Sequence, residues 1–144
     1  MSELVTSSLR ALIQQRAQGK CEYCLLHEED EILSHEPDHI IATKHRGETH
    51  ESNLAWTCFA CNRHKGTDLA SINQETGRVV RLFNPRRDKW TRHFRLEGAL
   101  IIPTTPKGRV TEYLLQFGRL ERIERRELAD RGGPVSPIRR MRLI

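Results

Sequence analysis

Long hydrophobic runs are missing from this sequence of 144 residues. No apolar stretch approaches the roughly 18 to 20 residues that a membrane-spanning helix needs. A basic stretch followed by an apolar core, the mark of a secretory signal, is also missing from the first residues, MSELVTSSLRALIQQ. Hydrophobic residues make up 37% of the chain and charged residues 30%, which predicts a thin apolar interior. We therefore expect a cytoplasmic protein without membrane contact, whose core needs a further stabilising element.

Cysteine is scarce, and its four residues form two C-x-x-C pairs, Cys21 with Cys24 and Cys58 with Cys61. In a chain that is not secreted, such pairs indicate metal binding rather than disulfides. Four thiolates at this spacing match the ligands of a structural tetrahedral zinc site. The alternative, a redox motif in one pair and an accident in the other, stays open. The pairs are 33 residues apart, more than the roughly 15 to 20 of a simple zinc ribbon, which indicates a functional insert between them.

The net charge of +5 is unevenly distributed. Residues 1–66 hold 7 basic and 10 acidic side chains, whereas residues 67–144 hold 17 and 9. A basic second half beside an acidic, histidine-rich first half is typical of a phosphate-binding surface next to a cation site. A basic tail that is merely solvated would give the same count.

Apolar spacing predicts a helix that is capped by Ser7 or Ser8 and stops at Gly19. Pro37 is expected to separate two short extended segments, 32–35 and 39–42. The second cysteine pair leads into one or two helical turns that end at Gly66.

The elements expected after residue 66 are a turn at 74–77, a strand at 78–83, a short helix at 85–94 with Trp90 and Phe94 inward, a strand at 96–102 broken at Gly98, a helix that follows Gly108 and contains Val110, Leu114 and Phe117, and a charge-rich helix at 119–130.

The insert between the cysteine pairs carries the candidate catalytic residues Asp38, His39 and Asn53, and Asn62 follows directly after Cys61. A hard cation such as Mg²⁺ or Mn²⁺ prefers oxygen ligands, which the Asp38 carboxylate and the Asn62 amide can supply. A neutral imidazole suits the deprotonation of water near pH 7, a role for His39. Adjacent residues of a strand point to opposite sides, so this arrangement requires a bent backbone or a site approached from two sides.

Each of these residues also fits an ordinary role when taken alone. His39 fits a surface histidine or a further zinc-site residue, Asp38 a turn former, and Asn53 a loop or capping residue. Their combination with the cysteine frame favours the catalytic interpretation.

The segments that run from CEYC through HEPDHIIATKHRG, ESNLAWTCFACN and RHKG resemble the HNH endonuclease family. The stretch LFNPRRDKW and the following HF resemble small stand-alone bacterial members. One departure is Ala42, where a proline is common. The resemblance implies an α+β fold with a ββα-metal (His-Me finger) core, stapled here by the four cysteines. We expect one nuclease domain over residues 1–118, with the part that carries the resemblance at about 20–66. After it, residues 119–144 are expected to form a charged helix and a flexible basic tail, because Gly132, Gly133, Pro134 and Pro137 oppose regular structure.

The resemblance also implies a role for each candidate residue. Asp38 and Asn62 bind the catalytic divalent ion, His39 is the general base, and Asn53 orients the loop and the base. His35 and His64 are candidates for phosphate contact or metal support, with purely structural roles equally open.

Basic side chains beside Asn62 and around Trp90 are candidates for contact with nucleic acid. They are Arg63, Lys65, Arg86, Arg87, Lys89 and Arg92. An ordinary charged helix face is the alternative. In the helix at 119–126, arginine alternates with glutamate, which indicates internal ion pairs.

The sequence thus predicts a metal-dependent endonuclease that hydrolyses DNA, expected to be double-stranded, with structural Zn²⁺ and catalytic Mg²⁺ or Mn²⁺. A homodimer is one way in which a single small domain could cut both strands. Two other classes stay open: a non-catalytic zinc-dependent nucleic-acid-binding module, and a structural or regulatory protein stabilised by zinc.

Overall fold

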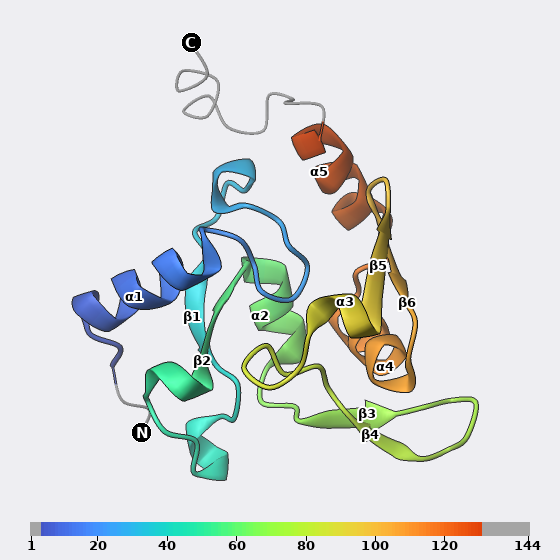
Figure 1. Ribbon diagram of the computed structural model, residues 1–144, viewed down its shortest axis with the longest axis horizontal. Coiled ribbons are helices and arrows are strands. Elements are labelled where there is room, and N and C mark those ends of the chain that lie inside the picture. Colours follow the sequence, from blue (N-terminus) through green and yellow to red (C-terminus); the bar gives the residue numbers. More distant parts are fainter. Residues whose placement is uncertain (1–3, 131–144) are drawn as a thin grey trace.

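The computed structural model describes residues 4–130, and helices alternate in it with short antiparallel strand pairs (Figure 1). In chain order the helices and strands are α1 (Ser7–Ala17), β1 (Glu36–His39), β2 (Leu54–Thr57), α2 (Phe59–Lys65), β3 (Ala70–Ile72), β4 (Val79–Arg81), α3 (Trp90–His93), β5 (Phe94–Glu97), β6 (Leu100–Pro103), α4 (Pro106–Leu115) and α5 (Leu120–Asp130). The strands pair as β1–β2, β3–β4 and β5–β6. The predicted α+β class is confirmed.

Helix α1 is capped one residue earlier than predicted. The Thr6 side chain accepts a hydrogen bond of 3.2 Å from the Leu9 N–H, so Thr6 rather than Ser7 or Ser8 is the N-cap. The helix ends at Gln18 and Gly19, both with positive φ, where the expected stop lies.

Pro37 lies inside a strand rather than between two, so the prediction of a break there was wrong. Strand β1 runs Glu36–His39 and pairs Pro37 with Trp56 of β2. Within residues 4–130, β1 has β2 as its only partner, so it is an edge strand. A proline is tolerated there because its missing N–H can face away from the ladder.

The middle of the chain departs most from the predicted elements. Strand β3 was not foreseen; its partner β4 lies within the strand expected at 78–83. The helix expected at 85–94 is reduced to the four residues of α3. The strand expected at 96–102 is instead the hairpin of β5 and β6, which turns at Gly98 with a φ of +60°.

The main core is built around the four cysteines. Buried apolar side chains packed with them include Tyr23, Phe83, Phe94, Leu115 and Phe117. Trp90 packs against this cluster as predicted, and its indole N–H donates to the Tyr23 carbonyl at 2.8 Å. A smaller cluster of Ile13, Leu54 and Trp56 lies under α1.

Helix α4 begins at Pro106, before the expected start after Gly108, because Thr105 caps it by accepting from the Gly108 N–H at 3.0 Å. Helix α5 follows closely and matches the predicted charge-rich helix. None of the helices among the described residues combines the length and apolar character needed to cross a membrane. The tail predicted after α5 lies outside the described residues.

Candidate functional site

The functional candidates lie on a ββα unit formed by β1, β2 and α2, near the centre of the molecule (Figure 1). The register pairs Asp38 with Ala55 and His39 with Leu54. Helix α2 contacts β1, and Gly66 ends it as predicted. The second cysteine pair starts this helix, since Cys58 is its N-cap and its sulfur accepts from the Cys61 N–H at 3.4 Å.

Asp38 is the buried carboxylate of this unit, with 8% of its surface exposed. Lys65 Nζ of α2 lies 3.0 Å from Asp38 Oδ2, in an ion pair without hydrogen-bond geometry. Burial raises the pKa of Asp38, and the charges of Lys65 and His39 oppose that rise. The carboxylate is therefore held in a weakly solvated place where a cation favours its ionised form.

Lys65 was expected on the surface as a nucleic-acid contact, and its burial does not fit that expectation. Only 2% of the residue is exposed, and Nζ also donates to the His39 carbonyl at 3.1 Å. A buried ammonium needs an anionic partner and hydrogen-bond acceptors. Asp38 and the main chain of β1 supply both, so Lys65 ties α2 to the residues that it faces.

His39 is half-buried, and its Nε2 lies 2.8 Å from Oγ1 of Thr49. Thr49 belongs to the loop that joins β1 to β2 and was not among the sequence candidates. Nothing in its local sequence distinguishes it from the other polar residues of that loop. The contact restricts the rotation of the imidazole and engages one ring nitrogen.

Asn53 holds the loop between β1 and β2 through its side-chain amide. Its Oδ1 accepts from the Ile41 N–H at 2.9 Å, and its Nδ2 donates to the carbonyls of Ile41 at 3.0 Å and Glu48 at 2.8 Å. Gly47 makes this possible, because a Cβ there would overlap the Ile41 carbonyl oxygen and crowd Asn53 Nδ2. These contacts support a loop-orienting role for Asn53.

We expect Asn53→Ala to lower the free energy of unfolding by about 1–3 kcal/mol, since it removes three hydrogen bonds and leaves main-chain groups unpaired. Urea denaturation of the zinc-loaded protein measures this change. Glu48→Ala is the matched control because it keeps the main-chain carbonyl that Asn53 uses. Equal stability of the two variants would contradict the role given to the Asn53 amide.

Asn62 lies on α2 and is partly buried, three residues before Lys65 and so on the same side of the helix. The described contacts include no hydrogen bond of its side-chain amide. The unit thus brings Asp38 on β1 close to the helix that carries Asn62. Among the described residues, Asp38 does not belong to any cluster of three or more histidine, cysteine, aspartate or glutamate side chains that could hold a metal ion.

The two histidines predicted to support the site, His35 and His64, make contacts that differ from those of Asp38 and Asn62. His35 is 1% exposed, and its Nε2 is 2.8 Å from the Leu26 carbonyl, to which it must donate. Its ring lies near Trp56, so it fixes the first cysteine loop against β2. His64 is half-buried on α2, and burial followed by the charge of Arg122 lowers its pKa.

The four cysteines form one buried cluster with their sulfur atoms within 4.8 Å of one another. Cys24 Sγ and Cys58 Sγ are 3.7 Å apart. A tetrahedral zinc with Zn–S bonds of about 2.3 Å requires sulfur separations of roughly 3.8 Å, so the cluster fits that ion. The backbone N–H of Cys24 approaches Cys21 Sγ at 3.5 Å, a contact that favours a thiolate. The cluster indicates zinc binding.

The acid–base properties of these thiols also call for a cation. Burial raises the pKa of Cys21 and of Cys61, while the neighbouring thiols lower that of Cys24. Four adjacent buried thiols cannot all ionise without a compensating charge, and a thiol bound to zinc is deprotonated.

The remaining basic candidates differ in exposure. Arg63, Arg87, Lys89 and Arg92 are exposed, and the Arg63 guanidinium lies over the Phe59 ring at 5.9 Å. Arg86 is half-buried and forms an ion pair with Glu22. Burial, followed by the charge of Arg16, lowers the pKa of Arg86 to about 10. Arg86 therefore has a structural partner, whereas the other four reach solvent.

One segment of this chain is similar to a known protein family. Residues 21–68 match the model of the HNH endonuclease family. The matched segment contains both cysteine pairs and the whole ββα unit, so this part of the chain is similar to an HNH endonuclease domain, and the α+β structure with its four-cysteine cluster is consistent with an HNH-type fold. No curated protein matches the chain. No solved structure matches it either. The family match indicates a nuclease or nucleic-acid-related function.

Proposed function

From the HNH match over residues 21–68, we propose that this protein is a metal-dependent endonuclease that hydrolyses DNA phosphodiester bonds. The observation that carries the proposal is the end of β1, where the buried carboxylate of Asp38 is followed by His39 with its ring held by Thr49. Around them, α2 brings Asn62 and the loop is held by Asn53.

Asp38 and Asn62 would hold the divalent ion, Mg²⁺ or Mn²⁺. The donor set fits a hard cation, since it offers a carboxylate and an amide oxygen, and water and substrate phosphate would complete the shell. The Asp38 carboxylate already has a cationic partner, with Lys65 Nζ 3.0 Å from Oδ2, and this ion pair supports the ionised form that a divalent ion would bind. When bound, the ion stabilises negative charge on the phosphate and on the leaving oxygen.

His39 would act as the general base. If its Nε2–H donates to Thr49, Nδ1 is free to take a proton from water. The water oxygen then bonds to phosphorus while the bond from phosphorus to the 3′ oxygen breaks. The leaving oxygen takes up a proton, which yields a 3′-hydroxyl and a 5′-phosphate.

The exposed side chains of Arg63, Arg87, Lys89 and Arg92 would contact the phosphates of double-stranded DNA. Such contacts carry no sequence information and weaken steeply with salt. A single catalytic centre would nick one strand; a homodimer would supply a second centre for the other.

The experiment that tests the proposal is plasmid nicking by the zinc-loaded protein with added Mg²⁺ or Mn²⁺. We expect Asp38→Asn and Asn62→Ala to lose at least about 100-fold in rate while they keep one zinc per chain, because they remove ligands of the catalytic ion and none of the four cysteines. Asp38→Asn also leaves the buried Lys65 without its anionic partner, so circular dichroism of this variant checks that it is folded. Asp68→Asn, an exposed change just after α2, is the control.

Plasmid that stays intact with every metal and pH, while the protein still retards duplex DNA in a gel, would contradict the nuclease. It would favour the alternative, a non-catalytic zinc-dependent nucleic-acid-binding module.

A further inference from the structure

Arg122 of α5 reaches the cysteine cluster from outside the family-matched segment. Its Nη2 donates to Cys61 Sγ at 3.0 Å and lies 3.8 Å from Cys58 Sγ. Its Nη1 donates to the Leu115 carbonyl at 2.6 Å, and its guanidinium lies over the Phe117 ring at 5.7 Å. The head group is thus fixed on three sides, with one edge on two predicted zinc ligands.

The charge of Arg122 complements that of a zinc centre with four thiolates. Such a centre carries a net charge of −2, and burial makes that charge costly. A charge-assisted hydrogen bond to Cys61 would stabilise the metal-bound state more than one with neutral thiols.

Helix α5 is held to the protein largely by two arginines. Its two buried residues are Arg122 and Arg126, and Ala129 packs against the main core, whereas Leu120 and Leu128 are exposed. One turn after Arg122, Arg126 donates to the carbonyls of Ala99 at 2.7 Å and Phe117 at 2.8 Å. Burying two guanidinium groups against carbonyls alone is unfavourable, so the docked position of α5 depends on an anionic cluster beneath it. The expected internal ion pairs are present for Arg119, which pairs with Glu121 at 3.5 Å, and for Arg125, which pairs with Glu31 at 3.8 Å, whereas Arg122 and Arg126 bind sulfur and carbonyl groups instead.

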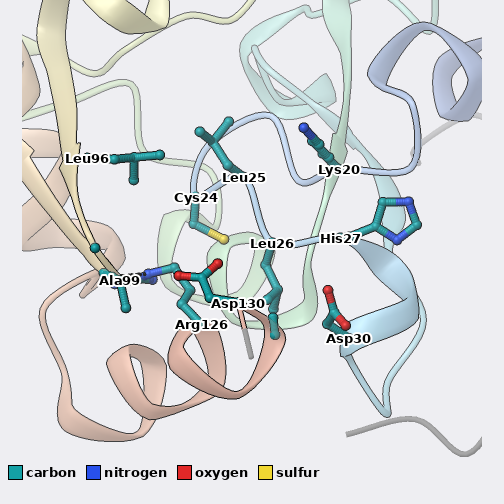
Figure 2. Close-up of a pocket in the computed structure, with 12 residues that line it drawn as sticks. Lys20, Cys24, Leu25, Leu26, His27, Asp30, Leu96, Ala99, Arg126 and Asp130 are labelled. Atoms are coloured by element: carbon teal, nitrogen blue, oxygen red, sulfur yellow. Dashed lines mark hydrogen bonds between the residues drawn. The ribbon is translucent and has the colours of Figure 1, made fainter. Parts of the chain in front are cut away.

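Docked α5 also covers one route to the cluster. A cavity of about 290 Å³ separates the first cysteine loop from the β5–β6 hairpin and α5. Figure 2 shows the Cys24 sulfur on one side of this cavity and Arg126 with Asp130 on the other. Movement of α5 away from the loop would widen this opening and expose the sulfur of Cys24 to solvent and to competing ligands.

We propose that Arg122 is a counter-ion of the zinc–thiolate centre and that zinc retention and the docking of α5 are thermodynamically linked through it. Linkage is reciprocal: if zinc favours docked α5, docked α5 must favour bound zinc by the same factor. Groups that hydrogen-bond to metal ligands typically contribute 10- to 100-fold to metal affinity.

The first test is the rate at which the zinc-loaded full chain transfers zinc to the chromogenic chelator 4-(2-pyridylazo)resorcinol. We expect Arg122→Met to release zinc at least about 10-fold faster than wild type, and Arg122→Lys, which keeps the charge, to fall in between. Glu127→Gln is the control on the same helix, because the Glu127 side chain is exposed to solvent and none of the described contacts of α5 uses it. It should stay within about twofold of wild type.

The second test follows α5 itself by Glu-C digestion at Glu121, Glu124 and Glu127. Zinc-loaded Arg122→Met should be cut at these three sites faster than zinc-loaded wild type, while cutting at Glu22 in the first cysteine loop stays slow in both. Wild-type zinc release by Arg122→Met, equal release by Arg122→Lys and Arg122→Met, or wild-type cleavage of α5 in zinc-loaded Arg122→Met would each overturn the linkage. Neither test contains DNA, so both are independent of the proposed nuclease activity.

Discussion

His39→Ala is expected to slow DNA cleavage by about 10²- to 10⁴-fold, the contribution that a positioned general base makes in enzymes. The imidazole follows the buried Asp38 on β1 and is oriented by Thr49, so no neighbouring group would replace it at once. Single-turnover rates on a supercoiled plasmid measure the loss. Zinc content and duplex binding should not change, since His39 contacts none of the cysteines.

His45→Ala is the matched control, because His45 is exposed and lies in the loop that joins β1 to β2. A second readout separates lost chemistry from lost structure: added imidazole should restore part of the rate to His39→Ala and none to Asp38→Asn. Full cleavage by His39→Ala would remove His39 from the role of base.

Cys58→Ala is expected to abolish the folded state rather than to weaken it. Binding of structural zinc to four thiolates contributes on the order of 10 kcal/mol, comparable to the whole stability of a small domain. Cys58 also caps α2 by accepting from the Cys61 N–H, so its loss affects the helix that carries Asn62 and Lys65. Circular dichroism and zinc stoichiometry of the purified variant measure the outcome.

Wild type treated with a strong chelator should reproduce the spectrum of Cys58→Ala, and re-added Zn²⁺ should restore wild type but not the variant. A well-folded chain without zinc would refute this prediction. The apolar core explains why the effect is so large. The cysteines lie inside the main cluster with Tyr23, Phe94 and Phe117, so an unliganded site leaves repelling or unpaired thiols in the middle of the packing.

The sequence predicted the structure correctly where the residues that determine a feature are neighbours in the chain. The C-x-x-C spacing predicted the buried cluster, and Gly66 predicted the end of α2, because each depends on residues adjacent in the chain. The prediction of a strand break at Pro37 was wrong, because it relied on the local rule against proline in strands. Among residues 4–130, β1 is an edge strand, and an edge strand tolerates a proline. The prediction also missed β3, whose three residues form a strand only because β4 pairs with them.

Long side chains were the hardest to place. Lys65 was predicted to be a surface cation, and Arg122 to take part in the ion pairs of an alternating Arg–Glu helix; both are buried. Each has its partner far away in sequence, Asp38 for Lys65 and Cys61 for Arg122, and no helical or strand period relates residues so far apart. Only the packing of α2 on β1, and of α5 on the core, brings these charges together.

By itself the sequence determined the HNH-type motif, the four cysteines of the buried cluster and the order of the candidate catalytic residues, because residue type and short-range spacing are properties of the chain itself. Tertiary structure alone decided the environment of those residues: the ion pair of Asp38 with Lys65, the hydrogen bond between Thr49 and His39, and the contact of Arg122 with Cys61. The physical reason is that burial and electrostatic pairing depend on distance in space, and segments from opposite ends of the chain set that distance only after they pack.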